Sequence, residues 1–214
     1  RKSDHRVCVS ILLLAFSSCC CTDAPLVVDP GGVPEAINVS APIDLPLVSI
    51  SNMDNGLFDE EVAYGDRKLL LNGSGLCEWG FLGVDLYHAA LYAERRIDDA
   101  AWAQDGDQVV VIHLQFARTL TAGQLREAFE ASVKTNTGDQ FASFEGALGQ
   151  LNGCLSTSEA GDTYSFIADP ERGLIVQRDG NVIAQIEDDA FRKLFVRLYI
   201  GDKPPTMALR KSLL

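Results

Sequence analysis

The chain has 214 residues, of which 47% are hydrophobic and 22% are charged, which is the ordinary composition of a globular protein with a sizeable core. It carries 30 acidic and 18 basic residues, for a formal net charge of -12, and no run of basic residues is longer than two. Binding to nucleic acid or to an anionic membrane surface needs clustered Lys and Arg, so the composition argues against both as main partners.

The first 21 residues have the layout of an export signal. A basic start precedes an apolar run of ten residues, 7–16, and small residues and cysteines follow. Ten residues are half of the roughly 20 that span a bilayer as a helix, so we expect export without a permanent transmembrane anchor. The stretch Phe16-Ser17-Ser18-Cys19 resembles the lipobox of bacterial lipoproteins, which implies lipidation of Cys19 and a place in the periplasm or cell envelope. Plain secretory cleavage nearby is the alternative.

Residues 22–66 read as an acidic linker. They contain nine acidic residues, no Lys or Arg, and five of the eight prolines. Proline stiffens the chain and like charges repel, so we expect an extended, poorly packed tether whose C-terminal part can add an edge strand. The folded domain is then residues 67–214, which carry 20 acidic and 15 basic residues.

The domain opens with strand signals. Residues 68–71 and 79–93 predict two strands, and Asn72-Gly73 and Ser74-Gly75 predict turns after the first. Residues 109–116 alternate, with Val110, Ile112, Leu114 and Phe116 on one face. This pattern indicates a half-exposed strand with His113 as an outer-face polar residue, and not as a ligand or a base.

Helix signals come next. Thr121 and Gln124 form a capping box that starts a helix ending near residues 136–138. Phe141, Phe144, Leu148 and Leu151 have helical spacing and predict a second helix that stops at Asn152-Gly153. These phenylalanines suit either a ligand pocket or plain core, and we expect core.

The remainder returns to strands and then to helices. Three short runs, 163–168, 174–178 and 182–186, predict a meander of hairpins. Asp188 or Asp189 then caps a helix that turns Arg192, Lys193 and Arg197 outward and ends at Gly201, and a last helix follows Pro204-Pro205. The order predicts an α+β fold with helices packed on an antiparallel sheet.

The usual catalytic templates are missing from residues 22–214. No HExxH, GxSxG, P-loop, GxGxxG after a strand or CxxC occurs there, and three histidines with two distant cysteines do not make a zinc site. We therefore expect no metal and no cofactor. The pairs Asp98/Asp99 and Asp188/Asp189 are read as solvated caps. Cys77 and Cys154 either pair in an oxidising compartment or serve as small buried hydrophobes.

Three stretches together resemble the chalcone isomerase-like family. They are residues 71–92 (LNGSGLCEWGFLGVDLYHAALY), residues 180–198 from Gly-Asn-Val into the helix, and Ile200-Gly201-Asp202-Lys203-Pro204. Their order and spacing agree over residues 67–214. The resemblance implies an open-faced β-sandwich, in which helices pack on one face of a large antiparallel sheet and a ligand cleft lies between them.

In the plant enzymes of this family, an Arg stabilises a phenolate that attacks an enone, while a Thr and a Tyr act through water on the carbonyl. Here Cys77 stands at the position of that Arg and Tyr87 at that of the Thr. A thiol does not replace a guanidinium as a fixed cation, so we do not expect chalcone closure. Related plant proteins bind fatty acids, and the loss of the Arg weakens that function too.

Three functions are compatible with these residues. The first is an envelope-tethered domain that binds a small apolar or amphipathic molecule, with Cys77, Tyr87 and Tyr92 lining the cleft. The second is an isomerase, of the intramolecular lyase type and with an unknown substrate, in which Tyr87 is the general acid. The third is a structural or protein-interaction domain of the envelope, supported by the acidic tether.

Overall fold

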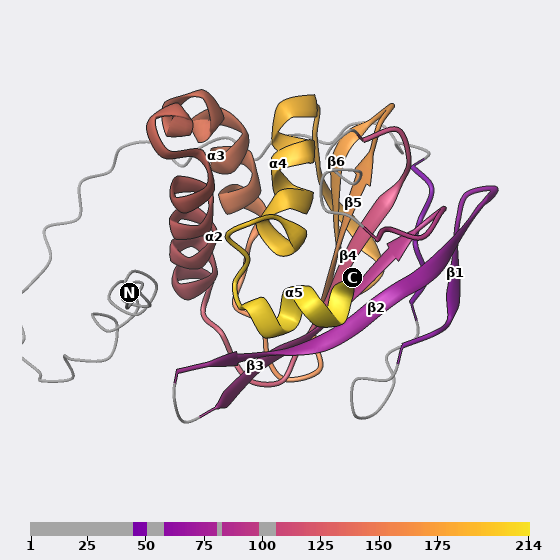
Figure 1. The fold of residues 1–214 in the computed structure, drawn as a ribbon. Helices are drawn as coiled ribbons and strands as arrows, with labels where there is room; N and C mark the ends of the chain where they lie inside the picture. The colour runs from indigo at the N-terminus through magenta and orange to yellow at the C-terminus, as the bar shows by residue number, and fades with distance from the viewer. Residues whose placement is uncertain (1–44, 51–57, 81–82, 99–105) are drawn as a thin grey trace, which may run out of the picture. The chain divides into compact units, whose positions relative to one another are not determined.

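Seven antiparallel strands lie side by side in the order in which they occur in the chain (Figure 1). The computed structural model describes residues 45–50, 58–80, 83–98 and 106–214. The chain divides into two compact units, Arg1–Leu45 and Pro46–Leu214, and the second contains the whole sheet. Its strands are β1 (Glu61–Tyr64), β2 (Arg67–Trp79), β3 (Val84–Ala93), β4 (Val110–Phe116), β5 (Thr163–Asp169), β6 (Gly173–Arg178) and β7 (Asn181–Ile186).

The helices gather on one face of this curled sheet (Figure 1). They are α2 (Ala122–Thr137), a 3-10 helix (Gly138–Phe144), α3 (Glu145–Cys154), α4 (Asp189–Ile200) and α5 (Met207–Leu213). An antiparallel sheet with helices on one face is the α+β, open-faced sandwich expected from the sequence, and the prediction of the fold is confirmed.

Local capping signals work as predicted. The Thr121 side chain accepts a hydrogen bond from the backbone of Gln124, whose own side chain accepts from the Thr121 N–H. Asp188 caps α4 through the N–H of Phe191 at 2.9 Å. The meander is also confirmed: Asp179 and Gly180 have φ angles of 48° and 79°, as a tight turn between β6 and β7 needs.

The turn predicted at Asn72–Gly75 is wrong, because β2 runs straight through these residues. The pairing of β2 with β3 shifts register between Leu71 and Gly73, so Asn72 is an extra residue in a β-bulge. A Cβ on Gly73 would lie 2.3 Å from the backbone oxygen of Ser212, and α5 lies against β2 in Figure 1. The glycines therefore allow α5 to approach the strand and do not form a turn.

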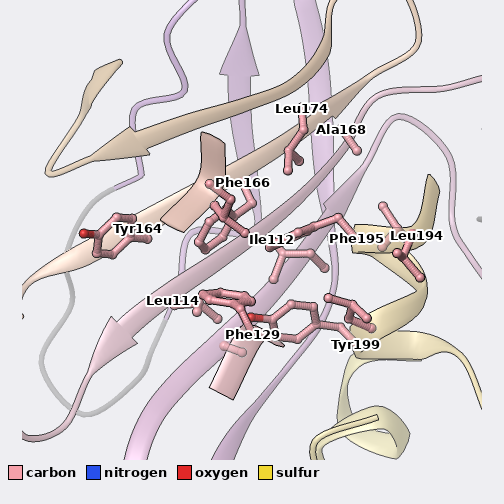
Figure 2. Close-up of a cluster of buried hydrophobic side chains, with 14 of the residues drawn as sticks. Ile112, Leu114, Phe129, Tyr164, Phe166, Ala168, Leu174, Leu194, Phe195 and Tyr199 are labelled. Carbon is pink, nitrogen blue, oxygen red and sulfur yellow. The ribbon is translucent and has the colours of Figure 1, made fainter. Parts of the chain in front are cut away.

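The main core lies between the sheet and the helices, and Figure 2 shows part of it. Direct cross-strand partners form rows on this face, for example Leu91, Ile112, Phe166 and Val176 on β3 to β6. Apolar residues of α2, α3, α4 and α5 close the cluster from the other side. Burial of these rows against the helices is the main source of stability for the unit.

The opposite face of the sheet is covered as well. A second cross-strand row consists of four fully buried residues, Tyr92, Val111, Ile167 and Ile175. Val48 pairs with Tyr64 as an isolated bridge. Packing of the chain before β2 against this face explains why β4 is buried on both sides and is not the half-exposed strand that was predicted.

Part of the predicted linker, residues 22–66, is thus integral to the fold. The compact unit begins at Pro46, and β1 (Glu61–Tyr64) is the edge strand that this segment was expected to be able to add. The reason is that Val48, Val62 and Tyr64 supply apolar side chains that are 2%, 6% and 1% exposed. The remainder of the linker up to residue 44, and the leader with Cys19, lie outside the described residues.

One helix face also differs from its prediction. Arg192 of α4 was expected to point outward, but its exposure is only 3%. Its Nε donates to Asp189 at 2.9 Å and its Nη2 donates to the carbonyl oxygen of Gly106 at 3.3 Å. A guanidinium tolerates burial here because a carboxylate and a backbone carbonyl accept its hydrogen bonds.

Candidate functional site

The sequence candidates Cys77 and Tyr87 are direct cross-strand partners on β2 and β3. Both belong to the face of the sheet that packs against the helices. A second register shift lies between Cys77 and Glu78, so the regular pairing is interrupted directly after Cys77 and resumes with Glu78 opposite Asp85. Cys77 is 3% exposed and Tyr87 is half-buried.

A third polar group reaches the same place from α4. Tyr199 is 3% exposed and belongs to the main core, and its ring stands 5.7 Å from that of Phe195. Figure 2 shows the Tyr199 hydroxyl pointing from the helix toward the sheet, on the side of Leu114 and Phe129. Tyr87 completes the group with an edge-on ring contact to Phe116 at 6.3 Å. We call Cys77, Tyr87 and Tyr199 the donor cluster.

Burial keeps all three groups of the donor cluster uncharged. Desolvation raises the pKa of the Cys77 thiol, and a hydrogen bond with Tyr87 offsets part of this rise. Desolvation raises the pKa of Tyr87 well above its ordinary value, and the nearby Tyr199 and Cys77 add to the effect. The pKa of Tyr199 is raised by burial first and by Cys77 second. The cluster can therefore donate hydrogen bonds but supplies no fixed charge.

The chemistry open to this cluster is limited by that neutrality. A thiol with a raised pKa is a poor nucleophile, because the thiolate is the reactive form. A phenol that holds its proton firmly is a good hydrogen-bond donor and a poor general acid. Among the described residues, no Lys or Arg contributes to the pKa of any of the three groups. The arrangement suits recognition of a polar atom better than proton transfer.

An aromatic cluster continues from Tyr199 into the core (Figure 2). Phe166 and Phe195 lie 4.5 Å apart between ring centroids, and Phe129 lies 5.7 Å from each. Phe141 and Phe144, read from the sequence as core, are partly buried and pack against the same cluster. A molecule held at the donor cluster would therefore meet aromatic and aliphatic walls.

The third sequence candidate, Tyr92, is separated from the other two. It is five positions from Tyr87 on β3, and an odd spacing in a strand places side chains on opposite faces. Its hydroxyl donates to the carbonyl oxygen of Asp59 at 3.1 Å, on the face covered by the chain before β2. Cys77 and Tyr87 are thus brought together, and Tyr92 is not part of their site.

His113 occupies the face predicted for it but is not exposed. It is 2% exposed, its Nδ1 lies 2.8 Å from Ser165 Oγ, and Phe58 packs edge-on at 5.7 Å. Its Nε2 is buried without a hydrogen-bond partner among the described residues. Desolvation lowers the pKa of His113 to about 4, so the imidazole is neutral at physiological pH.

The remaining candidates from the sequence are the two cysteines and the two aspartate pairs. Cys77 and Cys154 are both free. Asp188 is the helix cap described above, and Asp98 pairs with Arg96 at 3.0 Å, while Asp99 lies outside the described residues. No group of three or more potential metal ligands occurs in the described ranges. Within those ranges no helix is both long and apolar enough to cross a membrane.

Sequence reasoning missed Tyr199. The helical spacing of Phe191, Phe195 and Tyr199 was available as a signal, since residues four positions apart share one helix face. A tyrosine continuing an apolar stripe brings one hydroxyl into the core, and such a hydroxyl usually finds a hydrogen-bond partner when buried. Which strand it meets depends on how α4 docks, and that was not readable from the sequence.

Comparison with known proteins agrees with this fold. A family profile described as chalcone isomerase-like matches residues 51–214. Among solved structures, the crystal structure of a fatty-acid binding protein of Arabidopsis thaliana is similar, with a TM-score of 0.58 and 20% sequence identity over 71% of this chain and 88% of that chain. At this identity the likeness concerns the fold alone. A sequence search of curated proteins found no match.

Proposed function

Because the chain belongs to the chalcone isomerase-like family, we propose that its folded unit binds a small apolar or amphipathic molecule between the sheet and the helices and does not close chalcones. The observation that carries the proposal is the donor cluster. At the strand position where the resemblance expects the catalytic Arg, the chain has Cys77, a buried thiol with a raised pKa.

The charge of that position decides between binding and chalcone closure. Attack by a phenolate needs a group that stabilises the negative charge, and a preorganised cation or donor array does so in a site without water. Cys77 offers no positive charge, and burial is the main cause of the rise in its pKa. A neutral donor cluster of this kind favours binding over the isomerase function, in which Tyr87 would have to release its proton despite a strongly raised pKa.

The apolar surroundings support the same proposal. The donor cluster adjoins Phe116, and the rings of Phe129, Phe166 and Phe195 continue from it through the core. Binding sites for small molecules combine apolar walls with a few well-placed polar groups. The similar Arabidopsis structure is described as a fatty-acid binding protein, which supports an apolar ligand for this chain as well.

The test is native mass spectrometry of the protein purified from its own expression host, followed by solvent extraction and identification of what is released. We expect an added mass of a few hundred daltons, on the order of the size of a ligand that such a pocket buries. The Tyr87→Phe variant, prepared in parallel, should retain less of it. An apo mass for the unmodified protein, with no binding on addition of lipid extract, would contradict the proposal and favour an interaction domain.

Export and tethering form the second part of the proposal. The leader 1–21 and the lipobox-like stretch ending at Cys19 support attachment of the folded unit to the cell envelope through a lipid. Labelling with palmitate in a bacterial host should modify the full chain, and Cys19→Ser should abolish the label. Cys20→Ser is the matched control and should keep it. An unlabelled, secreted chain would indicate plain cleavage instead.

A further inference from the structure

The basic residues of the chain are unevenly distributed. Residues 190–214 contain six basic residues and one acidic residue, Asp202, although the whole chain carries a net charge of -12. We propose that the end of α4, the loop after it and α5 form a surface that docks on an anionic phospholipid membrane. This α5 surface consists of Arg197, Lys203, Met207, Arg210 and Lys211.

The four cations of the α5 surface form no ion pair with a described residue. The other two basic residues of this stretch both pair with Asp189 within α4. By contrast, the cations of the α5 surface bond at most to backbone carbonyl oxygens: Lys203 Nζ donates to Thr135 at 2.8 Å, and Arg210 Nε donates to Ile200 at 2.9 Å. A carbonyl oxygen does not neutralise a cation, so the α5 surface attracts anions.

The structure brings these cations to one end of α4. The side chain of Arg197 lies against Gly201, where a Cβ would stand 2.6 Å from the Arg197 Cγ. The hydrogen bond from Arg210 to Ile200 holds α5 at the same helix end. Lys203 lies in the loop that joins the two helices (Figure 1). The positive charges therefore form one surface although two helices supply them.

The apolar member of the α5 surface is Met207. Its side chain is 61% exposed, more than any other large apolar side chain among the described residues. It lies three positions before Arg210 and four before Lys211, so the three share one helix face, whereas Leu209 and Leu213 are buried. An exposed apolar side chain with Lys and Arg around it is typical of helices that lie at the boundary between lipid headgroups and acyl chains.

The size of the apolar area favours a lipid surface over a protein partner. A stable protein interface buries about 1,200–2,000 Å², which one exposed methionine does not approach. A membrane needs only shallow insertion of that side chain, because each Lys or Arg near an anionic leaflet adds its own attraction. The net charge of the chain argued against an anionic membrane, but charges farther away than about 8–10 Å are largely screened at physiological ionic strength.

The proposed tether allows this face to reach the bilayer. The 26 residues between Cys19 and Pro46, 20–45, span up to about 90 Å when fully extended, against a diameter of roughly 40 Å for a unit of this size. The anchor alone therefore selects no face, and the α5 surface does. The inference rests on the tethering proposed above only for the presence of a membrane nearby.

The test is hydrogen exchange of the full chain, as its expression host processes it, on two kinds of vesicle. One is phosphatidylcholine alone, and the other contains about 30% phosphatidylglycerol, which is anionic. We expect the amides of residues 202–213 to exchange about tenfold more slowly on the anionic vesicles. At about 0.5 M salt, where the screening length falls to about 4 Å, the difference should disappear.

Three variants assign the effect to the α5 surface. Lys203→Glu with Lys211→Glu should abolish the difference between vesicles, and Lys211→Glu alone, which breaks no described hydrogen bond, should reduce it. Lys68→Glu with Arg96→Glu changes the net charge equally at exposed side chains elsewhere and is the matched control, which should keep the difference.

The outcomes separate this inference from the tethering. Equal exchange on both vesicles, or an equal loss in the control pair, would overturn the inference. Slow exchange of α5 without vesicles that is lost at high salt would also overturn it, because acidic residues of the chain itself would then cover the surface. Protection of α5 on anionic vesicles in a chain without attached lipid would contradict the tethering and leave the inference standing.

Discussion

At the scale of single residues, the face of the sheet opposite the helices contains a buried carboxylate that is bonded to a tyrosine and to a partly exposed arginine. The Tyr64 hydroxyl donates to Asp169 Oδ2 at 2.7 Å, and Arg172 donates to the same oxygen at 3.1 Å. Burial alone would raise the pKa of Asp169, but the hydrogen bonds from Tyr64, the Glu171 N–H and Arg172 lower it overall. The carboxylate is thus held ionised although it is 0% exposed.

Loss of the Tyr64 hydroxyl should therefore be costly. We expect Tyr64→Phe to lower the free energy of unfolding by about 1–3 kcal/mol, because a buried carboxylate loses one of its donors. Urea unfolding at neutral pH measures this. Tyr199→Phe makes the same substitution in another buried tyrosine, whose pKa is affected by burial and by Cys77 but by no carboxylate, and it should change the free energy of unfolding much less. Equal losses in the two variants would mean that the Tyr64 hydrogen bond contributes little.

The residues of the site were only partly predictable. Cys77 and Tyr87 were identified through the family motif, and the structure pairs them across β2 and β3. Tyr92 was grouped with them although strand alternation alone places it on the other face of β3. The partner of the pair, Tyr199, comes from a helix more than 110 positions away, and such a contact depends on tertiary docking that no local pattern contains.

At the scale of elements, local signals predicted helix starts well and failed in β2. Capping by Thr121 and Asp188 depends on residues within one turn, so it is readable in the sequence. The glycines of β2 are ambiguous, since a glycine serves a turn and a close approach equally well. Here Asn72 donates to the carbonyl oxygens of Ile97 and Leu213, at 3.0 and 2.7 Å, and joins the bulge to α5.

The close approach of α5 gives a direct prediction. In Gly73→Ala the new Cβ would lie 2.3 Å from the Ser212 oxygen and 2.8 Å from the Leu213 oxygen, both backbone atoms that cannot rotate away. We expect α5 to shift and the free energy of unfolding to fall by about 1–3 kcal/mol, the usual cost of overpacking. Urea unfolding measures the loss, and protection of the α5 amides from hydrogen exchange reports the shift.

The control for this variant is another glycine to alanine substitution. Gly149 lies inside α3, and a Cβ there would meet nothing within 4 Å. Gly149→Ala should stabilise the protein by about 0.5–1 kcal/mol, because alanine favours the helix over the unfolded chain. A similar small gain in Gly73→Ala would show that α5 does not press on β2 as described.

At the scale of the whole folded unit, the second face of the sheet depends on chain that precedes the predicted domain. The amide of Gln177, oriented with its nitrogen toward the Val48 carbonyl, donates to that oxygen and accepts from the Val48 N–H, each at 3.2 Å. Acidic residues and prolines around Val48 indicated a linker, and residues 22–66 do carry nine acidic residues and no Lys or Arg. What it could not reveal is that a few apolar residues in this segment cover a buried sheet face, because their partners are strands far along the chain.

His113 lies under this cover, and its surroundings determine how the fold responds to acid. Its cross-strand partners are Ala90 on β3 and Ser165 on β5, and the ring of Phe58 packs against it. Desolvation is the cause of its lowered pKa, and no charged group among the described residues contributes. Protonation would place a positive charge among apolar and neutral groups, so the folded state resists it.

The free energy of unfolding should therefore fall as the pH is lowered from about 6.5 to about 4. The pKa of His113 is about 4 in the folded state against 6.5 for an ordinary histidine, so within this window the unfolded chain binds more protons and acid favours unfolding. The loss attributable to His113 approaches about 3 kcal/mol at the lower end. Asp169, whose pKa is lowered from 3.8, titrates below this window.

Urea unfolding of the full chain at a series of pH values measures the slope of the free energy of unfolding against pH. His113→Gln should flatten this slope, and the control His88→Gln should leave it unchanged. An unchanged slope in His113→Gln would show that the cover admits water or a counter-ion to the imidazole.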